Sequence, residues 1–300
     1  MHENVHRTFF QEVLMNARRL KQLTPYLLLL PAIIFLFIFF AFPMVNAFSL
    51  AFQSDAGDWT LGHFSTMIND VAFAQAFRTT LLLLIIIIPV QFALALIMAL
   101  LIQSKLKFSG LFLYVYSIPL GISELAAGIV WFAIFTERGY LNTILTGLGI
   151  LEKPFIFLSY QNTGWLLFAV VVAEVWRATS IVMVILVAGL QSIPSEFLEA
   201  ADVFGATLWQ KIWQVILPML KPSLQVALIL RTILAFQVFA VAMAVAGRGV
   251  TLLAAEAYRW YGSYRNPHVA AAFAVLILVL SIFSTALYVW GLRTPEEQTL

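Results

Sequence analysis

The sequence contains no cysteine and few charged side chains, 11% of its 300 residues. A soluble domain carries about 25% charged residues. Without cysteine the chain can form neither a disulfide nor a cysteine-ligated metal site. Its formal net charge of +2 is too small to indicate nucleic-acid binding. Because 62% of the residues are hydrophobic, we interpret the chain as an all-α protein that crosses a membrane several times.

The sequence also lacks the motifs of an enzyme. None of its lysines is followed by serine or threonine, so it has no P-loop and no route of its own to ATP hydrolysis by that motif. Among its four histidines, only His2 and His6 lie close together, in a polar segment. We therefore expect no catalytic residue and no metal ion. An intramembrane enzyme is the less favoured alternative, because the sequence offers no evident pair of nucleophile and base.

Six apolar segments each reach the roughly 20 residues that a helix needs to cross a bilayer. They are residues 25–51, 79–104, 109–136, 164–190, 223–247 and 269–291. We treat residues 23–293 as one membrane domain, preceded by a cytoplasmic segment 1–22 and followed by a cytoplasmic tail 294–300. For residues 1–22, an interfacial helix and a partly ordered tail are both open.

The distribution of lysine and arginine predicts the orientation, since these residues favour the cytoplasmic side. With the N-terminus inside, nine of the 17 lie in inner segments, six in outer segments and two within spans. This bias predicts that both termini and residues 194–222 face the cytoplasm.

Residues 194–222 form the longest polar interruption between two spans. Gly205 predicts a helix stop or a sharp bend. The apolar residues after it recur with the spacing of one helix face; they are Trp209, Ile212, Trp213 and Ile216. Pro218 and Pro222 would close the segment. We predict a short helix, a bend and an amphipathic helix on the membrane surface, an elbow suited to a soluble partner, with a plain solvated connector as the alternative.

Ionisable residues within the spans are costly to bury, so they are paired or line a wet cavity. Glu174 and Arg177 are three residues apart and can form an intrahelical ion pair. Arg231 could point into a cavity or bind carbonyl groups of a neighbouring helix. For Glu124, a position at the membrane interface and a ligand role are both open. A proton relay through these groups would make the chain an ion-coupled secondary carrier.

The elbow carries a recognisable motif. It contains, in order, Glu199-Ala200-Ala201, Gly205 and Leu217-Pro218. This spacing resembles the EAA loop of the permeases of ABC importers, which is cytoplasmic and inserts into a cleft of an ATPase subunit. Members of that family usually have aspartate where this chain has Phe204, and isoleucine where it has Val215.

Most of the chain, residues 25 to 292, resembles a carbohydrate permease of the maltose-system class. The matching stretches are Gly62-His63-Phe64, Trp131 with Gly139-Tyr140-Leu141-Asn142, Glu174-Val175-Trp176-Arg177, Ala188 to Pro194 and residues 268–275. After the fifth span, family members often have Gly-Gly-Pro and then threonine. This chain has Gly247-Arg248-Gly249 and Thr251 there.

The resemblance implies a multi-pass permease of a prokaryotic inner membrane that imports a di- or oligosaccharide by alternating access. Its partners would be a second permease in a heterodimer, two ATPase subunits, an extracytoplasmic substrate-binding protein, the carbohydrate and membrane lipid. ATP and Mg²⁺ would bind to the partner ATPase, and no cofactor to this chain. The residues that the resemblance assigns to ATPase coupling are Glu199, Ala200, Ala201, Gly205 and Pro218.

Candidates for the substrate path combine the buried charges with an aromatic and amide group in the fifth span. They are Glu174, Arg177, Arg231, Phe236, Gln237 and Phe239. Flat rings suit the C–H faces of a sugar and an amide suits its hydroxyl groups, although phenylalanine also packs against lipid or other helices. A permease for glycerol phosphate or a polyol is the alternative within the class.

Overall fold

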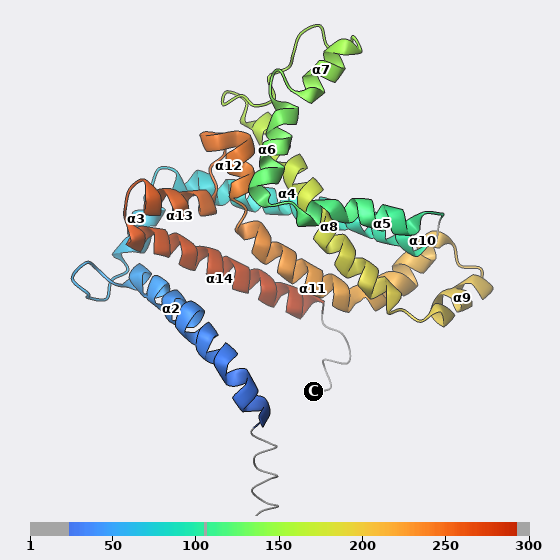
Figure 1. Ribbon diagram of the computed structural model, residues 1–300, viewed down its shortest axis with the longest axis horizontal. Coiled ribbons are helices and arrows are strands. Elements are labelled where there is room, and N and C mark those ends of the chain that lie inside the picture. The colour runs from blue at the N-terminus through green and yellow to red at the C-terminus, as the bar shows by residue number, and fades with distance from the viewer. Residues whose placement is uncertain (1–23, 105–106, 293–300) are drawn as a thin grey trace, which may run out of the picture. The chain divides into compact units, whose positions relative to one another are not determined.

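The computed structural model describes residues 24–104 and 107–292, and these ranges are almost entirely helical (Figure 1). Their β-structure is limited to one isolated bridge between Gln53 and Trp59. The predicted segments 1–22 and 294–300 lie outside the described residues. Residue contacts divide the chain into two compact units, Met1–Leu61 and Gly62–Leu300. The single membrane domain 23–293 stays a prediction.

The first unit contains one helix that runs from Thr24 to Phe52 and matches the first predicted span. It includes a π-helical turn, η1 (Phe37–Ala41), then α2 (Phe42–Ser49) and the 3₁₀ turn η2 (Leu50–Phe52). At 1.5 Å per residue, 29 residues exceed the thickness of a bilayer core.

The second unit is organised around two long helices, α4 (Phe73–Gln103) and α8 (Thr163–Gln191), which pack against each other. With α14 (Pro267–Gly291), they confirm the second, fourth and sixth predicted spans. Pro89 is tolerated inside α4, as membrane helices allow. The remaining helices outside the broken span and the elbow are α3 (Gly62–Ile68), α12 (Ala240–Ala246), η5 (Gly247–Gly249) and α13 (Leu253–Gly262).

The third predicted span, 109–136, is broken rather than continuous. It consists of α5 (Ser109–Ser117), η3 (Ile118–Gly121) and α6 (Glu124–Phe135), and α7 (Tyr140–Gly147) follows. The chain bends by 103° between Ser109–Gly121 and Glu124–Gly147. Ser123 starts the new helix, because its hydroxyl accepts the backbone N–H of Ala126 at 3.2 Å.

The fifth predicted span, 223–247, has the wrong limits. A single helical stretch runs from Leu208 to Phe236, through α10 (Leu208–Lys211), the π-helical turn η4 (Ile212–Ile216) and α11 (Leu217–Phe236). Pro218 and Pro222 therefore do not close the elbow, since both lie inside this stretch. The π-helical turn directly before Pro218 is the kind of local adjustment that accommodates a missing backbone donor.

Five described helices are long and apolar enough to cross a membrane, or seven if each of two bent pairs counts as a span. The second bent pair, Ala240–Gly249 with Leu253–Gly262, bends by 80°. The all-α, multi-span fold is therefore confirmed.

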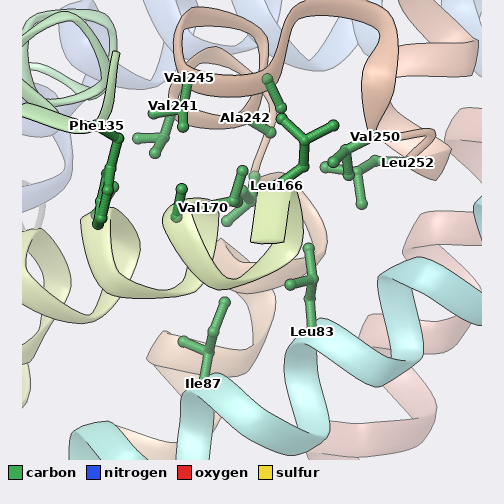
Figure 2. Packing of buried hydrophobic residues seen from close by; sticks show 14 of the residues in the cluster. Leu83, Ile87, Phe135, Leu166, Val170, Val241, Ala242, Val245, Val250 and Leu252 are labelled. Carbon is green, nitrogen blue, oxygen red and sulfur yellow. The ribbon is translucent and has the colours of Figure 1, made fainter. Parts of the chain in front are cut away.

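Buried apolar clusters hold the second unit together, and two of them are large. The first joins α4, α6, α8 and α12, and Figure 2 shows Leu83 and Ile87 of α4 pointing toward α8, and Val170 of α8 pointing toward Val241 of α12. The second joins α4, α8 and α11 near the elbow; among its buried members are Ala95, Met183, Leu186 and Leu220. Here α8 and α11 approach closely at Gly189, where an added Cβ would collide with the Ser223 side chain.

Candidate functional site

The elbow begins with α9 (Ser195–Val203), which carries Glu199, Ala200 and Ala201. Pro194 precedes its first residue and Glu196 lies in its first turn. Proline fits a helix start, and an acidic side chain there complements the helix dipole. Glu199 and Ala200 are both exposed, so this surface of α9 is open to a partner.

Gly205 forms the predicted bend, with a φ of +72°. The N–H of Ala206 donates to the carbonyl of Ala201 at 2.9 Å, and the N–H of Gly205 donates to that of Asp202 at 2.9 Å. These two hydrogen bonds are those of a Schellman motif, the usual helix ending at a left-handed glycine. The helix stop predicted from Gly205 is therefore present.

The second arm of the elbow starts at Thr207, which caps α10. Its hydroxyl accepts the N–H of Gln210 at 3.3 Å, and the Gln210 side chain accepts the Thr207 N–H at 2.8 Å. This reciprocal pair is a capping box. Lys211 at the end of α10 forms an ion pair with Asp202 of α9. Both arms are therefore fixed by local interactions and joined to each other.

Apolar side chains are exposed at the tip of the elbow. Val203 and Phe204 are 86% and 88% exposed, and Leu208 and Trp209 are also exposed. Of the predicted apolar face, Ile212 and Ile216 pack into the core, but Trp209 and Trp213 do not; Trp209 lies edge-on against Trp213, 5.4 Å between ring centroids. Large exposed apolar side chains gathered in this way are typical of a surface that contacts a protein or a membrane.

A charged network lies between spanning helices, centred on the fully buried carboxylate of Glu174 in α8. Arg177 donates to both of its oxygens, at 3.0 and 3.2 Å, so the intrahelical pair expected from their spacing is present. Arg231 of α11, also fully buried, donates to Glu174 Oε1 at 2.8 Å. The network therefore connects two spans through one carboxylate.

Gln91 of α4 completes this network, and the sequence patterns did not predict it. Its Oε1 accepts from Arg231 Nε at 2.6 Å, and its Nε2 donates to the backbone carbonyl of Glu174 at 2.9 Å. The available signal was the single polar side chain in the apolar run 81–102. Arg231 thus binds side chains of α4 and α8, rather than carbonyl groups of a neighbouring helix.

Glu124 joins the network from the other side. Its carboxylate accepts from Arg177 at 3.0 Å, and it sits at the start of α6, beside the break. The exposed fractions of the side chains are 36% for Glu124 and 17% for Arg177. Two carboxylates and two guanidinium groups balance in formal charge, and only the Glu124–Arg177 end reaches a surface. Glu124 is therefore an ion-pair partner of Arg177, and its position at the membrane interface stays a prediction.

The aromatic and amide candidates of the fifth span do not gather at one place. Phe236 is buried in an apolar cluster with Leu84 and Ile88, which leaves no ring face for a ligand in this conformation. Gln237 is exposed directly after α11 ends. Phe239 packs on Tyr258, with 5.0 Å between ring centroids. Of the three, Gln237 alone offers an open polar group.

A second aromatic group, not anticipated from the sequence, lines a cavity of about 580 Å³ between α4, α5, α6 and α8. Its rings belong to Tyr116, Trp131, Phe168 and Trp176. No charged residue lines it, and its polar groups include Thr179 and Ser180. Within the described ranges, no three histidine, aspartate or glutamate side chains gather as metal ligands.

Comparisons with known proteins match most of the chain. The family model described as "Binding-protein-dependent transport system inner membrane component" matches residues 91–291. The sulfoquinovosyl glycerol transport system permease of Agrobacterium fabrum is 31% identical over 283 residues, 90% of each chain. The trehalose/maltose transport system permease of Thermococcus litoralis is 28% identical over 276 residues, 88% of this chain and 91% of the relative.

A third relative and a solved structure extend these matches. The alpha-glucoside transport system permease of Rhizobium meliloti is 27% identical, over 95% of this chain and 86% of the relative. In the crystal structure of a bacterial ABC transporter that imports the acidic polysaccharide alginate, one chain superposes with a TM-score of 0.74 at 24% identity. That match covers 90% of this chain and 97% of the other. It shows a common fold.

Proposed function

Because this chain belongs to the family of binding-protein-dependent transport system inner membrane components, we propose that it is the permease subunit of an ATP-driven importer of carbohydrates. A carbohydrate substrate is supported by the near-full-length matches to permeases named for trehalose/maltose and for alpha-glucosides. Lactose and arabinooligosaccharides are the cargoes named for two further relatives. We therefore propose a di- or oligosaccharide.

The importer that we propose has more subunits than this chain. A second, related permease completes the path, two ATPase subunits bind ATP and Mg²⁺, and a binding protein delivers the sugar. This chain contributes no P-loop. A bacterial alginate ABC transporter of the same fold crystallised in complex with a periplasmic protein that holds an alginate pentasaccharide, which supports the binding-protein partner.

We assign the ATPase contact to the elbow. Glu199, Ala200 and Ala201 lie in the second half of α9, where Glu199 and Ala200 are exposed, and Gly205 sets the direction of the second arm. The exposed Phe204 stands where related loops usually have aspartate, so we expect an apolar rather than a charged contact at the tip. Pro218 lies within the following helix, so it affects the direction of that helix and does not end it.

The orientation follows from the elbow and from the charge bias. An elbow that binds a cytoplasmic ATPase places residues 194–222 inside, in agreement with the excess of lysine and arginine in the inner segments. Both termini then face the cytoplasm. A cysteine introduced at exposed Val203 in this cysteine-free chain should react with a membrane-impermeant thiol reagent only in inverted vesicles.

For the substrate path we assign the open end of the charged network. Glu124 and Arg177 reach a surface, whereas Glu174, Arg231 and Phe236 are buried and act on the path through their neighbours. A carboxylate and a guanidinium group at this end can accept from and donate to sugar hydroxyl groups. Gln237 is the further polar candidate.

The test is uptake by the complete complex, purified through a tag on this chain and reconstituted into liposomes. We expect ATP-dependent accumulation of a labelled neutral disaccharide such as maltose or trehalose, in the presence of the co-purified binding protein. Accumulation of labelled glycerol phosphate instead would favour the alternative cargo. Uptake that follows an ion gradient without ATP would refute the importer.

A further inference from the structure

The side-chain amide of Gln91 binds residues of two neighbouring helices. It is fully buried in α4, and its two hydrogen bonds have opposite polarity. One accepts from Arg231 Nε of α11 at 2.6 Å, and the other donates to the backbone of Glu174 in α8 at 2.9 Å. Only a side chain with both a donor and an acceptor makes this pair of contacts. Gln91 therefore joins three spanning helices.

The Arg231 guanidinium depends on these contacts. It donates through Nε to Gln91 and through one terminal nitrogen to Glu174, while its other terminal nitrogen has no partner among the described residues. Removing the Gln91 acceptor would leave Glu174 as its sole remaining partner within that part of the chain, in a fully buried site. A buried guanidinium group that loses a hydrogen bond is strongly destabilised there.

Arg231 lies five residues before the end of the helical stretch that begins in the elbow. The helical stretch from Leu208 to Phe236 is continuous, and Arg231 lies 20 residues after Lys211. At 1.5 Å per residue this is about 30 Å along the helix. A displacement of the elbow thus reaches Arg231 through a helix rather than through a loop.

From this arrangement we propose that Gln91 is a positioning residue for coupling: it holds Arg231 against Glu174, so that α11 moves together with α4 and α8 when the elbow moves. The proposal rests on the proposed function. If the Gln91–Arg231 contact is lost, the elbow and α11 move but α4 and α8 do not move with them. ATP is then hydrolysed without transport. The role differs from substrate contact, since Gln91 is fully buried.

The first test measures coupling in the complete reconstituted complex, as sugar imported per ATP hydrolysed and as ATP hydrolysis without binding protein. Gln91→Met keeps the approximate size and removes both hydrogen bonds, and Gln91→Glu keeps the acceptor for Arg231. Gln225→Met is the matched control, a glutamine with little exposure on α11 that lies outside the network. We expect the ratio to fall about tenfold in Gln91→Met, the effect of one hydrogen bond to a charged group.

The conservative variant separates positioning from general damage. Gln91→Glu should recover most of the ratio, and Gln225→Met should match the unmodified complex. Hydrolysis without binding protein should rise in Gln91→Met. An unchanged ratio in Gln91→Met at equal assembly would overturn the proposal, as would an equal loss in Gln225→Met.

A second measurement is independent of transport. Because this chain contains no cysteine, cysteines introduced at exposed Val184 of α8 and Val226 of α11 are its only labelling sites. Spin labels there report the distance distribution between the two helices. We expect a broader distribution in Gln91→Met, or in Gln91→Leu if Gln91→Met does not assemble, and a distribution close to the unmodified one in Gln91→Glu. An unchanged distribution would overturn the proposal, whereas a complex that imports no carbohydrate would refute only the proposed function.

Discussion

Lys211 at the end of α10 forms an ion pair with Asp202 of α9, and this contact closes the elbow across the bend at Gly205. The two side chains are nine residues apart in the chain. The arms also meet through apolar packing, since Leu198 of α9 and Ile212 of η4 contact the same buried cluster. The Asp202–Lys211 pair adds an attraction between opposite charges to this packing.

Reversing either charge of this pair should weaken ATP-driven uptake. We expect Asp202→Lys or Lys211→Asp to lower the initial rate about two- to fivefold, the range expected for a partly exposed ion pair worth about 0.5–1 kcal/mol. The combined exchange should restore the rate. The initial rate of uptake by the reconstituted complex, measured at low ionic strength, tests this prediction. A double variant that is no faster than the single variants would show that the ion pair does not hold the two arms together.

Substitution of Gly205 should act through backbone conformation alone. An added Cβ meets nothing within 4 Å, but φ is +72°, where most side chains are strained by about 1–2 kcal/mol. We expect Gly205→Val to lower uptake and Gly205→Asn, which tolerates this conformation, to retain most of it. Equal activity of the two variants at equal membrane level would show that the bend is dispensable.

Charge reversal at Glu199 should uncouple the permease from its ATPase. Glu199 is exposed on α9, so Glu199→Lys disturbs no packing and should leave membrane insertion and the level of the protein unchanged. We expect ATP-driven uptake to fall at least about tenfold and less ATPase subunit to co-purify, as for a charge placed against its partner surface. Glu196→Lys, one turn earlier on the same helix, is the control and should have a smaller effect.

The buried pair of Glu174 and Arg231 should contribute to stability non-additively. Glu174→Gln leaves the Arg231 guanidinium without its carboxylate, and Arg231→Met leaves Glu174 with Arg177 alone. Removing one partner of a buried pair costs about 3–5 kcal/mol. We expect thermal unfolding of the purified complex to shift less in the double variant than the sum of the single variants predicts. Strictly additive shifts would mean that the two charges do not interact.

Sequence patterns were sufficient where the cause is local. Apolar length predicted the helices that became α4, α8 and α14, and the spacing of Glu174 and Arg177 predicted their ion pair. Gly205 predicted the helix stop, because a left-handed residue favours glycine. Each of these signals depends on residues within one turn or one uninterrupted segment.

The missed features depend on contacts far along the chain or on local alternatives of similar energy. Gln91 meets partners 83 and 140 residues away, and no periodicity marks one polar residue within an apolar run. Proline gave an ambiguous signal: Pro119 lies in the turn that precedes the 103° bend, whereas Pro222 lies inside a continuous helix. Neighbouring helices can satisfy the backbone groups that a proline frees, so its effect is decided by packing.

The break before α6 has a consequence for the biosynthesis of the protein. Before the bend lie the nine residues of α5 and the four of η3, and after it the twelve of α6. Each piece is shorter than the roughly 20 residues that partition alone into a bilayer as a spanning helix. The two pieces must therefore enter the membrane together, against helices such as α4 that precede them on the nascent chain. Membrane insertion of this segment is thus a cooperative step that the rest of the chain has to support.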